Sequence, residues 1–109
     1  MEIRLYEKDE LVEYIRVENN EILENIAYTD RFMGALYRNV KTYPVLFRIM
    51  KKRVMCKERW TPELLDSIGL KEYNVIEILK RTHGLDRDDF HWLTIDDDSV
   101  RYEDIKIRD

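Results

Sequence analysis

Residues 2–28 read EIRLYEKDELVEYIRVENNEILENIAY, a stretch in which apolar residues alternate with polar ones. This alternation is typical of β-strands whose two faces meet different surroundings. The breaks at Lys8-Asp9-Glu10 and Asn19-Asn20 are polar and suit tight turns, because Asn and Asp tolerate positive φ. The stretch therefore predicts a three-stranded antiparallel meander.

Beyond residue 28 the apolar residues recur every three or four positions, which predicts helices. Residues suited to begin a helix stand at four places: Thr29 or Asp30, Pro44, Thr61-Pro62-Glu63, and Asn74. Gly69 and Gly84 then stand where the last two helices would end. We expect about four helices.

Strand-like alternation returns near the C-terminus, with Phe90, Trp92 and Thr94 on one side. We expect this strand to return to the sheet formed by the meander. Residues 100–107 fit either a last strand or a helical turn. The predicted fold is α+β, with residues 1–109 forming a single domain.

Composition narrows the class of protein. Hydrophobic residues make up 44% and charged residues 39%, with only three Gly and two Pro, which favours an ordered globular chain. Cys56 is the only cysteine, so no intramolecular disulfide forms and a reducing compartment fits best. The chain has neither a signal-peptide pattern nor the roughly 18 apolar residues that span a bilayer. We expect a cytoplasmic protein without membrane contact.

Charge is distributed unevenly along the chain. Residues 30–59 carry a net charge of +7, whereas residues 1–29 and residues 84–109 each carry −5. Two interpretations stay open. The charges neutralise one another on folding, or the basic block forms a patch that faces an acidic partner or nucleic acid.

The helix expected after Pro44 carries much of this basic block. On a helical wheel its apolar side holds Val45, Leu46, Phe47, Ile49, Met50 and Val54. Arg48, Lys51 and Lys52 cluster on the other side. Arg53 falls within the apolar arc, so we expect it either to extend outward or to pair with an acidic segment.

Patterns that would indicate catalysis or metal binding are missing. Cys56, His83 and His91 lack the paired spacing of a zinc site, and residues 86–89 lack the Gly and Glu of a calcium loop. The chain contains no Gly-rich phosphate loop and no nucleophile elbow. The helices at 61–83 have the spacing of a helix-turn-helix, but apolar residues fill the recognition position. We therefore expect no enzyme, no cofactor and no metal.

Several short motifs in residues 51–109 carry a family resemblance. They are Lys52-Arg53, Gly69-Leu70, Gly84-Leu85 with Asp89 and Trp92, and Tyr102-Glu103-Asp104-Ile105. Together with the leading meander they resemble the N-terminal region that precedes the kinase core in HipA-like proteins of Firmicutes. Those proteins are serine/threonine kinases that act as toxins in bacterial toxin–antitoxin systems. The chain stops where the kinase core would begin, so no ATP-binding or catalytic residue is carried over.

The resemblance implies a non-enzymatic module that binds a HipA-like kinase and regulates it, as an antitoxin does. The residues expected to bind the partner are Trp60, Arg48, Lys51, Lys52, Phe90 and Trp92, because Trp is frequent in binding hot spots. Of the two tryptophans, we expect Trp92 to be buried and Trp60 to be exposed. Two alternatives stay open. The basic face of residues 38–59 binds nucleic acid, or the chain is a mobile-element inhibitor of a host defence protein.

Overall fold

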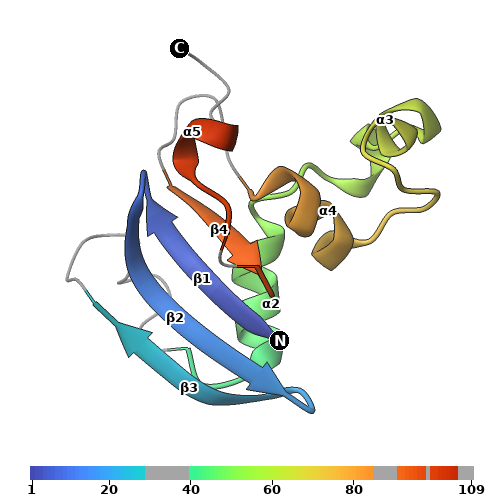
Figure 1. Ribbon diagram of the computed structural model, residues 1–109. Helices are drawn as coiled ribbons and strands as arrows, with labels where there is room; N and C mark the ends of the chain where they lie inside the picture. Colours follow the sequence, from blue (N-terminus) through green and yellow to red (C-terminus); the bar gives the residue numbers. More distant parts are fainter. Residues whose placement is uncertain (29–39, 85–90, 98, 106–109) are drawn as a thin grey trace.

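The structure is a computed structural model that describes residues 1–28, 40–84, 91–97 and 99–105. Its elements, in chain order, are β1 (Glu2–Glu7), β2 (Glu10–Glu18), β3 (Glu21–Ala27), α2 (Tyr43–Lys51), the 3-10 helix η1 (Lys57–Arg59), α3 (Pro62–Ser67), α4 (Val75–Thr82), β4 (His91–Ile95) and α5 (Tyr102–Ile105) (Figure 1). The α+β class is confirmed. Phe90 and the helix expected after Thr29 or Asp30 lie outside the described residues.

The meander forms as expected, because both predicted turns adopt the left-handed backbone that tight hairpins require. Lys8 has a φ of 54°, and Asn19 and Asn20 have φ values of 51° and 64°. Asn19 and Asn20 are two successive left-handed residues, whose twist matches that of the flanking strands, while the Lys8-Asp9 turn has one left-handed residue. β1, β2 and β3 are therefore antiparallel neighbours.

β4 completes the sheet by pairing antiparallel with β1, which gives the strand order β3-β2-β1-β4. The predicted return of the C-terminal strand is thus confirmed. On the outer edge of β4, the Leu93 N–H donates to the carbonyl of His83 at 2.9 Å. This contact ties β4 to the end of α4.

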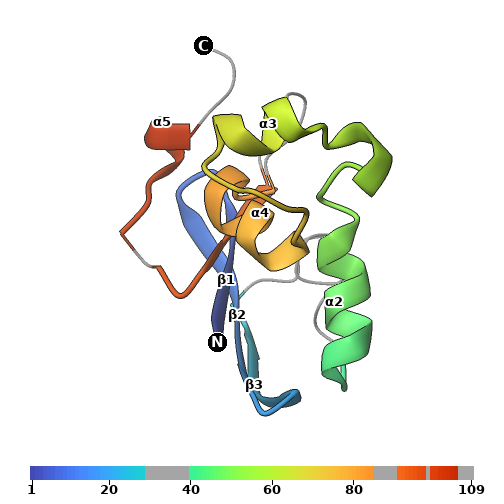
Figure 2. The same ribbon diagram turned by 90° about the vertical axis from the view of Figure 1, so that its right-hand side faces the viewer.

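The core lies between one face of the sheet and the helices. α2 crosses that face, while α5 lies on the opposite side of the sheet (Figures 1 and 2). The buried apolar cluster joins strand residues to residues of α2 and α4. Its fully buried members include Ile3, Leu5, Val12, Ile15, Leu46, Met50, Leu79 and Leu93.

A β-bulge changes which residues of β2 face the core. Leu5 pairs with Glu13 and Tyr6 with Leu11, so Val12 is the extra residue. Val12 and Glu13 are both fully buried. Simple alternation places Glu13 on the core face with Ile15 and Val17. It does not reveal the burial of Val12, because a bulge adds an unpaired residue and interrupts the strict in-and-out order of side chains.

α2 begins where Pro44 predicts, with the Pro in its first turn, and ends at Lys51. The expected apolar side is only partly correct, since Leu46 and Met50 are buried but Val45 is 41% exposed. Val54 lies beyond the helix. The chain continues from α2 into η1 and α3, and α3 lies well to one side of the sheet (Figure 1).

α3 and α4 have the predicted caps. The Thr61 hydroxyl accepts from the Leu64 N–H at 3.2 Å, and the Asn74 side chain accepts from the Glu77 N–H at 3.1 Å. Gly69 follows α3 with a φ of 80°. None of the described helices is long and apolar enough to cross a membrane.

Candidate partner-binding surface

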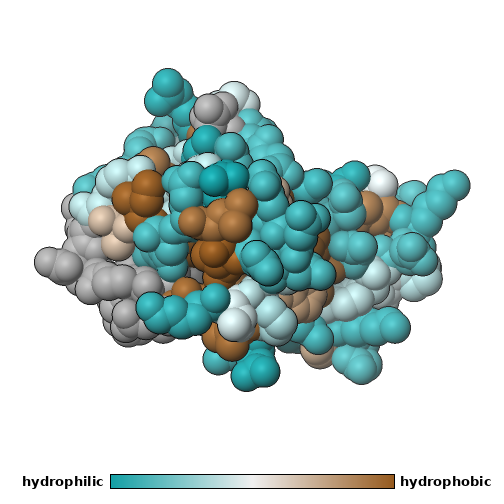
Figure 3. Space-filling model, turned by 90° about the horizontal axis from the view of Figure 1, so that it is seen from below, coloured by the Kyte–Doolittle hydropathy of each residue, from teal (hydrophilic) through white to brown (hydrophobic). Residues whose placement is uncertain are grey.

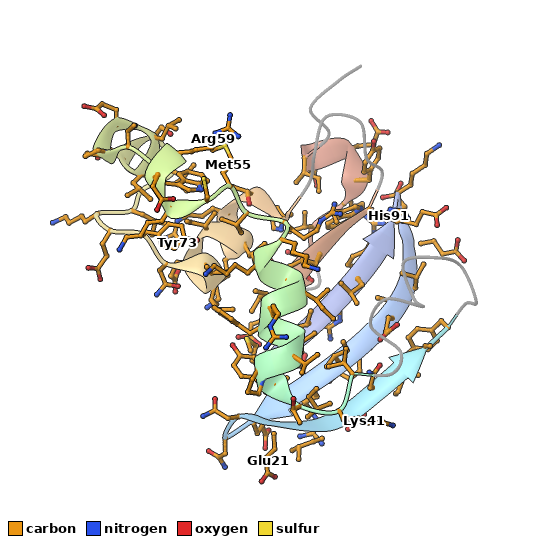
Figure 4. All side chains as sticks on the ribbon, turned by 180° about the vertical axis from the view of Figure 1, so that it is seen from behind. Glu21, Lys41, Met55, Arg59, Tyr73 and His91 are labelled. Carbon is orange, nitrogen blue, oxygen red and sulfur yellow. The ribbon has the colours of Figure 1, made fainter. Side chains whose placement is uncertain are left out.

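Five basic side chains gather on the solvent side of α2 and on η1. We name this group the basic surface: Arg48, Lys51, Lys52, Lys57 and Arg59. All five are exposed. Lys51 and Lys52 stand three and four positions after Arg48, on the same side of the helix end, while Arg59 lies where the chain turns toward α3 (Figure 4). The predicted basic side of this helix is present.

Within the described part of the chain, no ion pair engages the basic surface. Some cations elsewhere are paired with nearby carboxylates, as Arg16 is with Glu24 at 3.0 Å and Arg81 with Glu77 at 2.8 Å. Lys41, Lys71 and Arg101 have no ion pair among the described residues, but they stand singly in the sequence. The described part of the acidic C-terminal segment, with α5, lies on the other side of the sheet from α2 (Figure 2). Of the two interpretations of the basic block, internal neutralisation therefore gains no support from the described residues.

The basic surface has a rigid base. Leu46 and Met50 of α2 are fully buried against the sheet. Just beyond α2, Arg53 donates from Nε to the carbonyl of Gly84 at 2.9 Å and from an Nη to the carbonyl of His91 at 2.8 Å. This explains why an arginine stands in an apolar arc: it joins the end of α2 to α4 and β4.

Exposed apolar side chains stand within the basic stretch and close to it in the sequence. Val45, Met55 and Leu64 are each 41% exposed, and Met55 lies beside Arg59 (Figure 4). The sequence pattern singles out none of the three as a binding residue, and it places Val45 in the core. Seen from below, exposed apolar residues form patches surrounded by hydrophilic ones rather than one continuous surface (Figure 3).

Trp60 follows η1 and is half-buried rather than exposed as expected. Its indole Nε1 is buried, and so is the hydroxyl of Tyr73; neither has a hydrogen-bond partner among the described residues. Burial, together with the nearby Cys56 thiol and Glu58 carboxylate, raises the pKa of Tyr73. Both side chains belong to the same region at the end of the basic surface.

Trp92 belongs to the core and not to a partner surface. It is 1% exposed, its ring stacks on Tyr6 with 4.3 Å between centroids, and its indole N–H donates to the carbonyl of Lys8. The expectation of a buried Trp92 is correct, while its assignment to partner binding is wrong. Phe90 lies outside the described residues.

Carboxylates near the C-terminus accept hydrogen bonds from backbone N–H groups. An Asp96 oxygen accepts from the Glu2 N–H at 2.7 Å, and an Asp97 oxygen accepts from the Ser99 N–H at 2.9 Å. The second bond lowers the pKa of Asp97. An Asp104 oxygen accepts from the Arg101 N–H at 3.2 Å at the start of α5.

Metal ligands do not converge in the described ranges, where no three His, Cys, Asp or Glu side chains could hold an ion together. Cys56 is exposed, while the ring of His83 contacts the Leu93 carbonyl and that of His91 contacts Glu7. A shallow hollow of about 410 Å³ lies at the β2–β3 turn, next to the start of α2. None of the expected site residues lines it.

Comparison with protein-family models, with curated proteins and with solved structures finds nothing that matches this chain. Function is therefore inferred from the basic surface and from the residues around it.

Proposed function

We propose that this chain is a non-enzymatic protein-binding module whose partner docks on the basic surface. The observation that carries the proposal is the clustering of five exposed cations without an ion pair in the described residues. Arg16 and Arg81 have carboxylate partners, whereas the basic surface is exposed and has none. A rigid array of unpaired like charges favours association with a surface of opposite sign and speeds the encounter.

A HipA-like serine/threonine kinase is the partner that the sequence resemblance suggests, and the chain would regulate it as an antitoxin does. Support from the molecule is limited to a surface suited to docking. Mixing the purified chain with a HipA-like kinase tests the idea by size-exclusion chromatography and by kinase autophosphorylation. A shared elution peak and reduced autophosphorylation are expected, and separate elution of the two proteins contradicts this partner.

Nucleic acid is the second candidate, because unpaired cations on a helix also suit a phosphate backbone. Salt separates the two functions. Binding to DNA or RNA falls steeply as salt rises, since each neutralised phosphate releases counterions. A protein interface that buries apolar side chains depends less on salt. Affinity for the kinase and for a DNA duplex, each measured over a salt series, distinguishes them.

A further inference from the structure

We infer that the segment bound by the basic surface is an acidic peptide stretch that also carries large apolar side chains. The inference rests on the proposed function and specifies the chemistry of the partner at the same site. Charge complementarity supplies its first support. Five exposed cations lie between Arg48 and Arg59, and Glu58 is the only carboxylate within that stretch.

The second support comes from exposed apolar side chains within this stretch and close to it in the sequence. Met55 lies within the basic stretch, and Val45 and Leu64 flank it in sequence on α2 and α3. Each leaves 41% of its surface in water. A phosphate backbone cannot use such side chains, whereas Leu, Met or Phe from a peptide removes them from water.

Trp60 adds a third feature of the same region. The part of its ring that remains exposed lies at the junction of η1 and α3, next in sequence to Arg59. Trp next to Arg at a partly exposed position is typical of residues that dominate protein interfaces. These features favour an acidic peptide over nucleic acid.

Three probes test the inference. The first is an acidic peptide with Leu and Phe between its Glu residues. The second has the same length and charge, with Ser in place of Leu and Phe. The third is a DNA duplex. Trp92 is buried, so a change in tryptophan fluorescence on binding reports mainly on Trp60, and Trp60→Phe verifies that assignment.

Matched variants locate the binding site. Met55→Gln removes an exposed apolar side chain from the basic surface, and Leu23→Gln removes one of similar exposure from β3. Lys52→Glu reverses a charge on the surface, and Arg101→Glu reverses one next to α5, across the sheet. We expect the first variant of each pair to weaken binding of the apolar peptide about tenfold, and its control to leave binding unchanged.

Each outcome decides the question. Three results together support the inference: the apolar peptide binds about tenfold more tightly than the Ser peptide, Met55→Gln removes this difference, and Lys52→Glu weakens binding of both peptides. Equal affinity for the two peptides contradicts the claim that the bound segment uses apolar side chains, and it remains compatible with the proposed function. Stronger binding of DNA than of either peptide overturns both. If neither peptide nor DNA binds, the inference is overturned. The proposed function is then tested separately by mixing the chain with the kinase.

Discussion

The two tryptophans differ in how their indole N–H groups are satisfied. The N–H of Trp92 donates to the carbonyl of Lys8, whereas the buried N–H of Trp60 has no partner among the described residues. A buried donor without a partner costs roughly 1–3 kcal/mol, while a made hydrogen bond contributes about 1 kcal/mol. The same substitution therefore has opposite consequences at the two positions.

We predict that Trp92→Phe lowers the free energy of unfolding by at least about 1 kcal/mol, because it removes a hydrogen bond and leaves a gap beside Tyr6. Trp60→Phe removes an unsatisfied donor and should leave stability unchanged or raise it slightly. Urea unfolding of both variants provides the measurement. Greater destabilisation by Trp60→Phe than by Trp92→Phe would show that the roles of the two rings are reversed.

The two glycines with left-handed backbone offer a second matched pair. A Cβ on Gly84, whose φ is 62°, would lie 3.1 Å from Cβ of Arg53 and 3.4 Å from a methyl group of Leu79. On Gly69, whose φ is 80°, the nearest atom would be Nε of Arg81 at 4.0 Å. An alanine at either position would be strained by roughly 1–2 kcal/mol because of the left-handed backbone. Only at Gly84 would its Cβ also press against neighbouring side chains.

Gly84→Ala should therefore destabilise the chain more than Gly69→Ala, with the excess arising from displacement of Arg53. Thermal unfolding of the two variants measures the difference. Since Arg53 hydrogen-bonds the Gly84 carbonyl, its shift also weakens the tie between α2 and β4. Equal melting temperatures would rule out the packing conflict.

At the scale of elements, α3 and α4 have similar caps but different attachments to the core. α4 buries Val75, Ile78 and Leu79, whereas α3 buries only Leu65. Removing a cap costs a helix about 1 kcal/mol. Loss of a cap lowers the free energy of global unfolding only if the helix must be folded for the core to form.

We predict that Asn74→Ala lowers the global free energy of unfolding by about 1 kcal/mol. Thr61→Ala should instead leave it nearly unchanged and increase local opening of α3. Hydrogen exchange measured residue by residue separates the two, since faster exchange in the Thr61 variant should be confined to α3. Faster exchange throughout the sheet in that variant would contradict this division.

Protonation of Glu77 should make the stability of the protein depend on pH in the acid range. A hydrogen bond from Arg81, reinforced by the charge of Lys80, lowers the pKa of Glu77 from its usual 4.5. A lowered folded-state pKa gives stability that is present above the usual value and disappears as the pH falls through the folded value. Glu77→Gln should therefore lower stability slightly at neutral pH, where the contribution of the ionised Glu77 is present, and should flatten the loss of stability that the parent shows below pH 4.5. Unfolding of the variant and the parent over a pH series tests this, and identical profiles would contradict it.

What the sequence predicts correctly at this scale depends on local signals. Turns at Lys8 and at Asn19-Asn20, and caps at Thr61 and Asn74, are set by a few neighbouring residues and are confirmed. Features set by distant contacts do not follow from such signals. The carbonyl partners of Arg53 come from segments more than 30 positions away along the chain.

In the candidate site, too, some features follow from local sequence signals and others depend on distant contacts. Arg48, Lys51 and Lys52 follow from helical spacing and are exposed as expected. The half-burial of Trp60 depends on the packing around η1 and α3, and the exposure of Val45 on how α2 lies against the sheet; periodicity indicates neither. Burial of Val12 beside Glu13 likewise follows from a bulge that shifts the register between two strands.

For the whole molecule, the sheet separates charge. α2 and its cations lie on one side, while α5 and the described acidic residues near it lie on the other (Figure 2). Those carboxylates bind nearby backbone N–H groups instead of the basic surface. A chain with a net charge of −4 thus presents a local positive field.

This separation predicts that the chain is retained on heparin despite its net charge. Replacing Arg48, Lys51 and Lys52 together with Gln should lower the salt needed for elution, because these cations have no ion pair within the described residues. The same variant should also bind a DNA duplex with a weaker dependence on salt. The slope of the logarithm of the binding constant against the logarithm of salt concentration should fall by roughly 0.9 for each phosphate that is no longer neutralised. The control replaces Lys71, Arg81 and Arg101 with Gln, which changes the net charge equally but leaves the basic surface intact. An equal fall in retention for the two variants would mean that heparin responds to net charge alone, and the basic surface would then have no separate role in attracting an acidic partner.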